Sequence, residues 1–179
     1  MKTTSLLSFL DTPELADLGP GPRAGVEPLA SLKSKLEKAL SELKVTDARA
    51  ELVRATILLW HDHLDAAHTI AQDIDNRDGS YVHALMHRRE PDPDNAKYWF
   101  RRVGQHPCYP ELAAQAQELS KRTAQEKFVF QFIAREQWDA FDFVDACEQV
   151  TSTGTREQAE LLREIQRLEF QVLLNYLAN

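Results

Sequence analysis

Cysteine is scarce in this sequence, with Cys108 and Cys147 the only two among 179 residues. They lie far apart and lack the paired spacing of metal-binding cysteines, so we expect two reduced thiols rather than a disulfide. Long apolar runs are missing too. No window approaches the roughly 20 apolar residues of a membrane span, and the start of the chain is too short and too polar for a signal peptide. We therefore expect a soluble protein of the cytoplasm.

Basic residues are also few: the sequence has 21 lysines and arginines and 28 aspartates and glutamates, which gives a formal net charge of -7. Nucleic acids and anionic membrane surfaces both require a basic face, so neither is expected as a partner. The chain lacks a glycine-rich phosphate loop, a Gly-x-Ser-x-Gly elbow and a dinucleotide fingerprint. With 43% hydrophobic and 27% charged residues, the balance is that of a single globular domain.

Proline and glycine are concentrated near the N-terminus. Residues 11–28 hold four of the eight prolines and three of the six glycines, a density that blocks helix and strand alike. We predict an N-terminal arm over residues 1–27 and a folded domain over residues 28–179. The apolar residues Leu6, Leu7, Phe9 and Leu10 offer a short helical anchor for the front of the arm.

From Pro28 onward, apolar residues recur at spacings of three and four, the period of one helix face. No segment shows a persuasive alternating strand pattern. The sequence therefore predicts an all-α domain of about six to seven helices. Their expected ranges are 28–43, 47–74, 80–90, 95–103, 110–133, 136–150 and 155–179.

An imperfect repeat lies in the segment 48–107. Residues 55–74 and 84–104 read alike: a short helix, then Asp65-Ala66 or Asn95-Ala96, then a second helix. The pattern predicts helical hairpins of a tetratricopeptide-like kind, although the signature tryptophan and glycine are missing. For the first pair a single uninterrupted helix stays open, because the apolar spacing suits both arrangements. The second pair is divided by prolines and is the firmer hairpin.

All six histidines fall between His61 and His106. His83 and His87 stand one helical turn apart, with Glu90 on the same side. If residues 61–68 form continuous helix, three more candidate ligands share a face. Together these two faces would assemble a zinc or iron site, with His61, Asp65, His68, His83, His87 and Glu90 as candidate ligands. The plainer and commoner alternative is that these histidines cap helix ends or pair with nearby carboxylates, since two histidines at helical spacing are not a specific metal signature.

A second constellation is cationic. Between His83 and His106, five lysines and arginines stand against three acids, a local charge of +2 in an acidic chain. Such an island suggests a carboxylate or phosphate ligand, which arginine holds by paired hydrogen bonds, beside a wall of aromatic rings. The candidate ligand-binding residues are His83, His87, Arg88, Arg89, Tyr98, Trp99, Arg101 and Arg102. Salt bridges to the protein's own acids are the more common alternative.

The stretch from Trp60 to Pro107 resembles a family of uncharacterised bacterial and fungal proteins. The resemblance rests on His61-Asp-His-Leu-Asp-Ala-Ala-His68, on His87-Arg-Arg-Glu90 and on Asn95-Ala-Lys-Tyr-Trp-Phe-Arg-Arg-Val-Gly104, and it covers about a quarter of the chain. Those relatives usually carry Gly-Asp where this chain has Pro91-Asp92. The resemblance implies no activity, cofactor or catalytic residue. It suggests only that the histidine-rich segment is the hallmark of the family.

Three functions follow as hypotheses. The first is a binding module that takes a protein partner or an anionic small molecule through the face formed by residues 83–106. The second is a metal-dependent enzyme with His61, His68, His83 and His87 as ligands and Asp65 or Glu90 as a further ligand or general base. The third is a structural subunit that acts through its interfaces.

Overall fold

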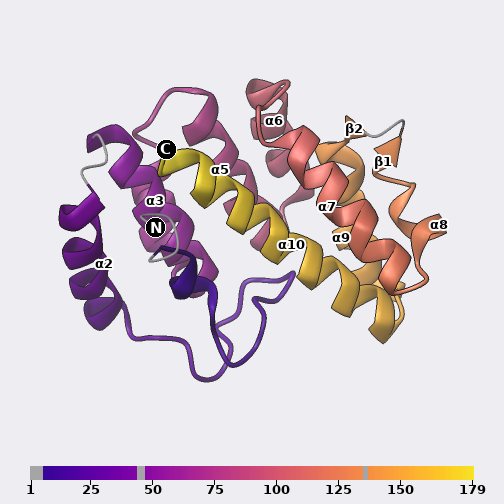
Figure 1. Ribbon diagram of the computed structural model, residues 1–179, viewed down its shortest axis with the longest axis horizontal. Helices are drawn as coiled ribbons and strands as arrows, with labels where there is room; N and C mark the ends of the chain where they lie inside the picture. Colours follow the sequence, from indigo (N-terminus) through magenta and orange to yellow (C-terminus); the bar gives the residue numbers. More distant parts are fainter. Residues whose placement is uncertain (1–5, 44–46, 135–136) are drawn as a thin grey trace.

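The computed structural model describes residues 6–43, 47–134 and 137–179, which form one all-α domain, as the sequence predicts (Figure 1). In chain order the elements are η1 (Ser8–Leu10), α2 (Leu29–Leu43), α3 (Asp47–Trp60), α4 (Leu64–Ala71), α5 (Arg77–Arg89), α6 (Pro93–Val103), α7 (Tyr109–Arg122), α8 (Glu126–Val129), β1 (Ile133–Ala134), β2 (Gln137–Trp138), α9 (Ala140–Thr153) and α10 (Arg156–Leu177). The described ranges thus hold nine α-helices rather than six to seven, because two of the predicted helices are each divided in two. None of the described helices is both long and apolar enough to cross a membrane.

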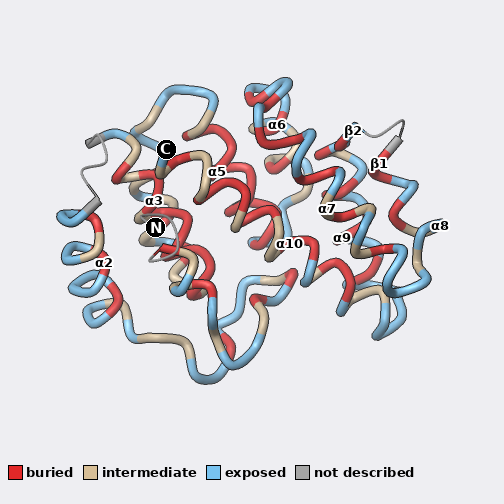
Figure 2. The backbone as a smooth tube through the Cα atoms, in the orientation of Figure 1, coloured by how far each residue is buried: buried red, intermediate tan, exposed pale blue. Residues whose placement is uncertain are grey.

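The long helix α10 runs diagonally across the molecule and packs on α3, α7 and α9 (Figure 1). Its start near residue 155 is as predicted, because Thr155 and Gln158 form a capping box that satisfies amide groups of the first turn. Buried residues concentrate in α3, α5 and α10 (Figure 2). Where α3 meets α10, the rings of Trp60 and Phe170 lie 5.3 Å apart between centroids. The core of the domain therefore surrounds α10.

The chain breaks between α3 and α4, so the alternative of one continuous helix over residues 53–74 is wrong. Asp62 adopts a left-handed backbone with φ of 63°, which ends the helix after Trp60. Leu64 then begins α4, which packs back against α3. α5 and α6 pack together in the same way. The chain therefore has two consecutive helix pairs in the segment 48–107, and their tetratricopeptide likeness stays a prediction.

Two helix starts differ from their predicted positions. α5, predicted to start at residue 80, starts at Arg77, and the Asn76 side chain caps it by accepting from the Gly79 amide. A side chain at Gly79 would meet the Ile74 carbonyl oxygen at 2.1 Å, which explains the glycine. α6 starts at Pro93 rather than at the predicted residue 95. Asp92 caps it by accepting from the Asn95 amide, and Pro93 needs no amide acceptor in the first helical turn.

The predicted helix over residues 110–133 is interrupted after Arg122. A left-handed Ala124 separates α7 from the single turn α8, and the chain then forms a small antiparallel hairpin with Ile133 opposite Trp138. The expectation of no strand is therefore wrong at these few residues. Packing explains the hairpin: Phe132, Trp138 and Phe143 form an aromatic cluster with centroid distances of 4.7–5.7 Å.

The N-terminal arm docks on the domain along its described residues, 6–27. Leu6 and Leu10 are buried, and η1 gives the predicted apolar anchor a helical turn. Gln166 of α10 donates to the carbonyl oxygens of Ala16 and Asp17, at 3.2 and 3.0 Å. Two backbone carbonyl groups of the irregular arm thus find their hydrogen-bond donor in α10.

Candidate metal centre

Three of the six histidines converge where α4 meets α5. His68 comes from α4, His83 and His87 come from α5, and each offers a ring nitrogen that lies within 4.8 Å of the other two. The rings of His83 and His87 are stacked, with centroids 4.9 Å apart and planes 15° from parallel, as their spacing of one turn allows. The His68 ring lies 4.7 Å from that of His83 and 5.7 Å from that of His87. Three imidazoles therefore face one small volume.

The His83 ring is held from one side. It stacks on Trp99 of α6 with 3.9 Å between centroids, and the residue is only 4% exposed. Its Nδ1 is buried and has no hydrogen-bond partner among the residues that the structure describes. An unsatisfied buried polar atom costs about 1–3 kcal/mol. A bound cation is one group that would remove this cost.

The protonation of His83 suits metal binding, which requires neutral imidazoles. Burial, together with the neighbouring His87 and His68, lowers the pKa of His83 to about 4. Burial also lowers the pKa of His87, although the nearby Glu90 carboxylate opposes that shift. At neutral pH the His83 ring is therefore neutral and able to donate a lone pair.

Two polar side chains surround His87. The Glu90 carboxylate Oε2 lies 3.1 Å from His87 Nδ1, an arrangement that keeps the proton on Nδ1 and leaves Nε2 as the ligand atom. The Asn95 amide nitrogen lies 3.2 Å from Nε2 and 3.3 Å from Nδ1. It has to turn aside when Nε2 takes a cation. Glu90 is thus placed to orient the His87 ring.

The separation of the three ring nitrogens shows how far the side chains have to move to bind an ion. Three nitrogens at the usual zinc distance of roughly 2.0–2.1 Å lie about 3.3 Å from one another. Ring nitrogens that are now within 4.8 Å of one another have to approach by at most about 1.5 Å. His68 is half-buried whereas His83 and His87 are buried, so His68 has the most room for the side-chain rotation that such a movement needs.

The other candidate ligands lie elsewhere. His61 would share a face with His68 only on a continuous helix, and the left-handed Asp62 breaks that helix. Its Nε2 instead lies 2.9 Å from the Phe9 carbonyl oxygen of the arm. Asp65 is exposed and does not belong to the ligand cluster found among the described residues. The expected set of six ligands is thus reduced to three histidines and the supporting Glu90.

The remaining two histidines follow the plainer alternative. His63 Nε2 lies 2.8 Å from the Glu27 carbonyl oxygen, and His106 Nε2 lies 3.1 Å from the Asp78 carboxylate. Together with His61, they tie chain segments to one another. One half of the histidines is thus structural, and the other half forms the cluster.

The structure does not place the predicted cationic residues on one face. The Arg88 guanidinium lies 2.6 Å from Glu169 in the interior, and that of Arg89 lies 2.7 Å from Asp62. Arg101 and Arg102 are exposed, above the rings of Phe141 and Trp99 at 5.9 and 5.2 Å. Tyr98 is 48% exposed, and Phe100 belongs to the core. Arg102 and Lys97 also pair with Asp75 and Asp145.

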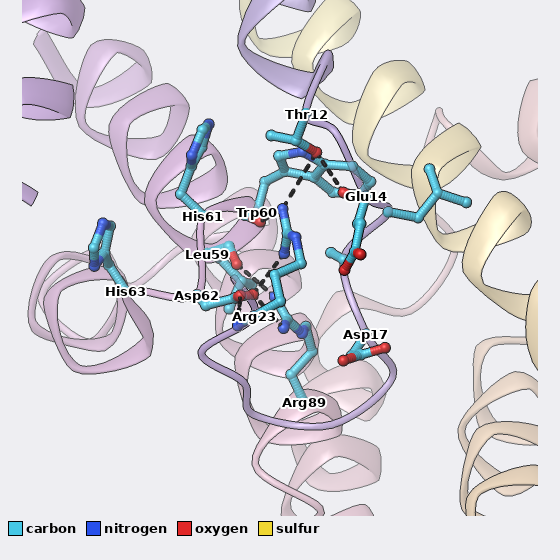
Figure 3. A network of polar contacts seen from close by, with 12 residues as sticks. Thr12, Glu14, Asp17, Arg23, Leu59, Trp60, His61, Asp62, His63 and Arg89 are labelled. Atoms are coloured by element: carbon cyan, nitrogen blue, oxygen red, sulfur yellow. Dashed lines mark hydrogen bonds and ion pairs between the residues drawn. The ribbon is translucent and has the colours of Figure 1, made fainter. Parts of the chain in front are cut away.

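Sequence reasoning missed a buried ionic network at Asp62 (Figure 3). Its carboxylate accepts from the guanidiniums of Arg23 and Arg89, both at 2.7 Å, and from the Arg23 amide at 2.9 Å. Gly21 lies against it, because a side chain at this position would approach the Asp62 Cγ to 2.8 Å. The signal in the sequence was the aspartate between two histidines, which the metal hypothesis left without a role.

Comparisons of the chain with known protein families, with curated proteins and with solved structures find no match.

Proposed function

We propose that the protein binds a divalent transition metal ion, zinc in the first place, through His68, His83 and His87. The observation that carries the proposal is the convergence of three ring nitrogens to within 4.8 Å. One of the three rings, that of His83, also has a buried Nδ1 without a hydrogen-bond partner among the described residues. Imidazole is a preferred ligand of zinc, copper, iron and nickel. The set contains no thiolate, which disfavours a structural zinc site of the cysteine-rich kind.

A centre with three protein ligands is typical of catalytic zinc sites, because the fourth position remains open for water or substrate. A metal bound there supplies Lewis acidity and lowers the pKa of a bound water toward neutrality. Glu90 is exposed beside His87, and it is the carboxylate that supports the centre from the protein side. We therefore propose a metal-dependent hydrolytic enzyme as the function, in which His68, His83 and His87 hold the ion and Glu90 orients His87.

The test is metal binding by the full chain without a histidine tag. Elemental analysis and titration with Co²⁺ are expected to give one ion per chain and the visible absorption of a four-coordinate cobalt site. His83→Asn and His87→Asn should each weaken binding on the order of a hundredfold, because each removes one of three ligands.

His63→Asn is the matched control, since this histidine contacts the Glu27 carbonyl oxygen and lies outside the cluster. It should leave the stoichiometry and the spectrum unchanged. Binding well below one equivalent, or equal losses in His63→Asn and His83→Asn, would show that the cluster is packing and not a metal centre.

A further inference from the structure

A cavity of about 320 Å³ lies between the arm, the turn that joins α5 to α6, and α9. The arm contributes Leu18, Gly19 and Pro20, and the turn contributes Pro91 and Pro93. α9 provides the opposite wall with Val144, Cys147 and Thr151. Apolar groups thus line most of the cavity, as in the usual small-molecule site.

The buried polar group of this cavity is Arg88, which forms part of its wall. The other polar lining residues, Glu148, Thr151 and Ser152, are exposed. Its side chain is only 2% exposed, and Nη2 lies 2.6 Å from the Glu169 carboxylate. Nε and Nη1 are buried, and neither has a hydrogen-bond partner among the described residues. Guanidinium donors normally find acceptors, since an unsatisfied buried donor is costly. An oxygen atom brought into the cavity beside Arg88 can accept from them after a small rotation of the side chain.

The buried charges of Arg88 and of the residues behind the cavity wall favour a negative ligand, whereas the one carboxylate that lines the cavity, that of Glu148, is exposed to solvent. Three guanidiniums, those of Arg23, Arg88 and Arg89, have side chains at most 3% exposed. Two carboxylates, those of Asp62 and Glu169, are at most 1% exposed and pair with them. One positive charge is thus left in excess, because Arg23 and Arg89 share the single carboxylate of Asp62. Arg89 connects this excess to the cavity, since it donates to the carbonyl oxygen of Gly19 in the cavity wall. A single anionic group would balance it.

The size of the cavity limits the ligand. A cavity of about 150 Å³ accommodates benzene, so about twice that volume accommodates an apolar body with a polar head of about ten to twelve non-hydrogen atoms in all. We propose that this cavity binds a monocarboxylate with an apolar chain of medium length, such as decanoate, with its carboxylate on Arg88 and its chain along Val144 and Cys147. This site is separate from the three-histidine centre and does not depend on a metal there.

The test compares ligands of one chain length and different head groups. Decanoate, decanol and decylammonium are titrated into the full chain below their aggregation concentrations by isothermal calorimetry. Decanoate should bind at least tenfold more tightly than decanol, because its head group forms charge-assisted hydrogen bonds. Decylammonium should bind more weakly than decanol. Equal affinity for the three ligands, or no binding of decanoate, would overturn the proposal.

Two variants locate the site. Thr151→Trp places a large side chain at the cavity wall, whereas Thr153→Trp changes a threonine two residues later that does not line the cavity. Both threonines are exposed on α9, and both hydroxyls donate to a carbonyl oxygen four residues earlier. Thr151→Trp should weaken decanoate binding at least tenfold, and Thr153→Trp should leave it unchanged. Equal effects of the two variants would place the ligand elsewhere.

A further variant tests the head group. Arg88→Met combined with Glu169→Gln removes the buried charges together, which avoids leaving one of them unpaired. In this double variant the preference for decanoate over decanol should fall to less than threefold. A preserved preference would contradict the role of Arg88. His83→Asn, which removes a metal ligand, should bind decanoate like the unmodified protein, so failure of the metal proposal and failure of this one are distinguishable.

Discussion

Replacing Asp62 by asparagine should remove several kcal/mol of the folding free energy. The substitution preserves the size of the side chain, and asparagine tolerates a left-handed backbone with φ of 63° about as well as aspartate does. It removes the charge that Arg23 and Arg89 share, and the side chains of these arginines are only 3% and 0% exposed. Asp62→Asn therefore isolates the electrostatic contribution from backbone strain and packing.

The magnitude follows from the burial of the network. Removing one partner of a buried ion pair costs about 3–5 kcal/mol, because an uncompensated charge stays in the interior. Two guanidiniums lose their shared carboxylate in Asp62→Asn, so we expect about 4–5 kcal/mol. Arg23→Met instead leaves Asp62 paired with Arg89 and should cost only about 1–2 kcal/mol, the value of the lost hydrogen bonds. The prediction therefore depends mainly on the ranking: Asp62→Asn should lose more folding free energy than Arg23→Met.

Urea unfolding followed by circular dichroism at pH 7 measures both losses. Asp65→Asn is the matched control, because this aspartate is exposed on α4 and should change stability by less than about 0.5 kcal/mol. Domains of this kind are stable by roughly 5–15 kcal/mol, so a folded baseline for Asp62→Asn should be accessible at low temperature. A loss below about 1 kcal/mol in Asp62→Asn, or a larger loss in Arg23→Met, would refute the reasoning.

Three further predictions concern the histidine cluster and the arm. The metal-free protein should lose about 3 kcal/mol of folding free energy as the pH falls from 6.5 to 4. Burial lowers the pKa of His83 in the folded protein to about 4 from 6.5, so this histidine is protonated in the unfolded chain before it is protonated in the folded one. Urea titrations across this range should show a smaller loss in His83→Asn. Glu90→Gln should weaken Co²⁺ binding about tenfold, because it removes the orienting carboxylate, and an unchanged affinity would contradict that role. Gly21→Ala should lower the folding free energy by at least twice the roughly 1 kcal/mol that Gly25→Ala costs. Both glycines have φ of 78°, but only a side chain at Gly21 meets Asp62. Equal melting temperatures of the two variants would exclude that contact.

The sequence was sufficient to predict the helices but not the breaks within them. Helix starts with a strong local signal, such as Thr155, lie where they were predicted, because capping depends on residues close in sequence. The break at Asp62 was left open, because the apolar spacing suits a continuous helix. Arg23, 39 residues away, holds the Asp62 side chain. A tertiary ion pair thus holds the residue at which the helix breaks, and no local pattern contains that contact.

The histidine cluster was half predictable for the same reason. His83 and His87 lie on one continuous helix, so their spacing alone places the two rings together. His68 was expected to join them together with His61, and the turn at residues 61–63 separates the two. That turn directs His61 toward the arm and leaves His68 on α4, opposite α5. The position of a second helix depends on tertiary packing, which the sequence pattern does not specify.

The last turn of α5 shows why basic residues that are adjacent in the sequence do not form a single binding face. Successive residues of a helix point about 100° apart, so three in a row diverge. His87 lies against His68 of α4, Arg88 pairs with Glu169 of α10, and Arg89 pairs with Asp62 after α3. One turn of helix thus reaches the three-histidine cluster, the wall of the cavity and the buried network that holds the arm. A cluster of charges in the sequence of a helix therefore indicates several separate contacts when the helix is buried, and a shared surface only when its residues are three or four apart.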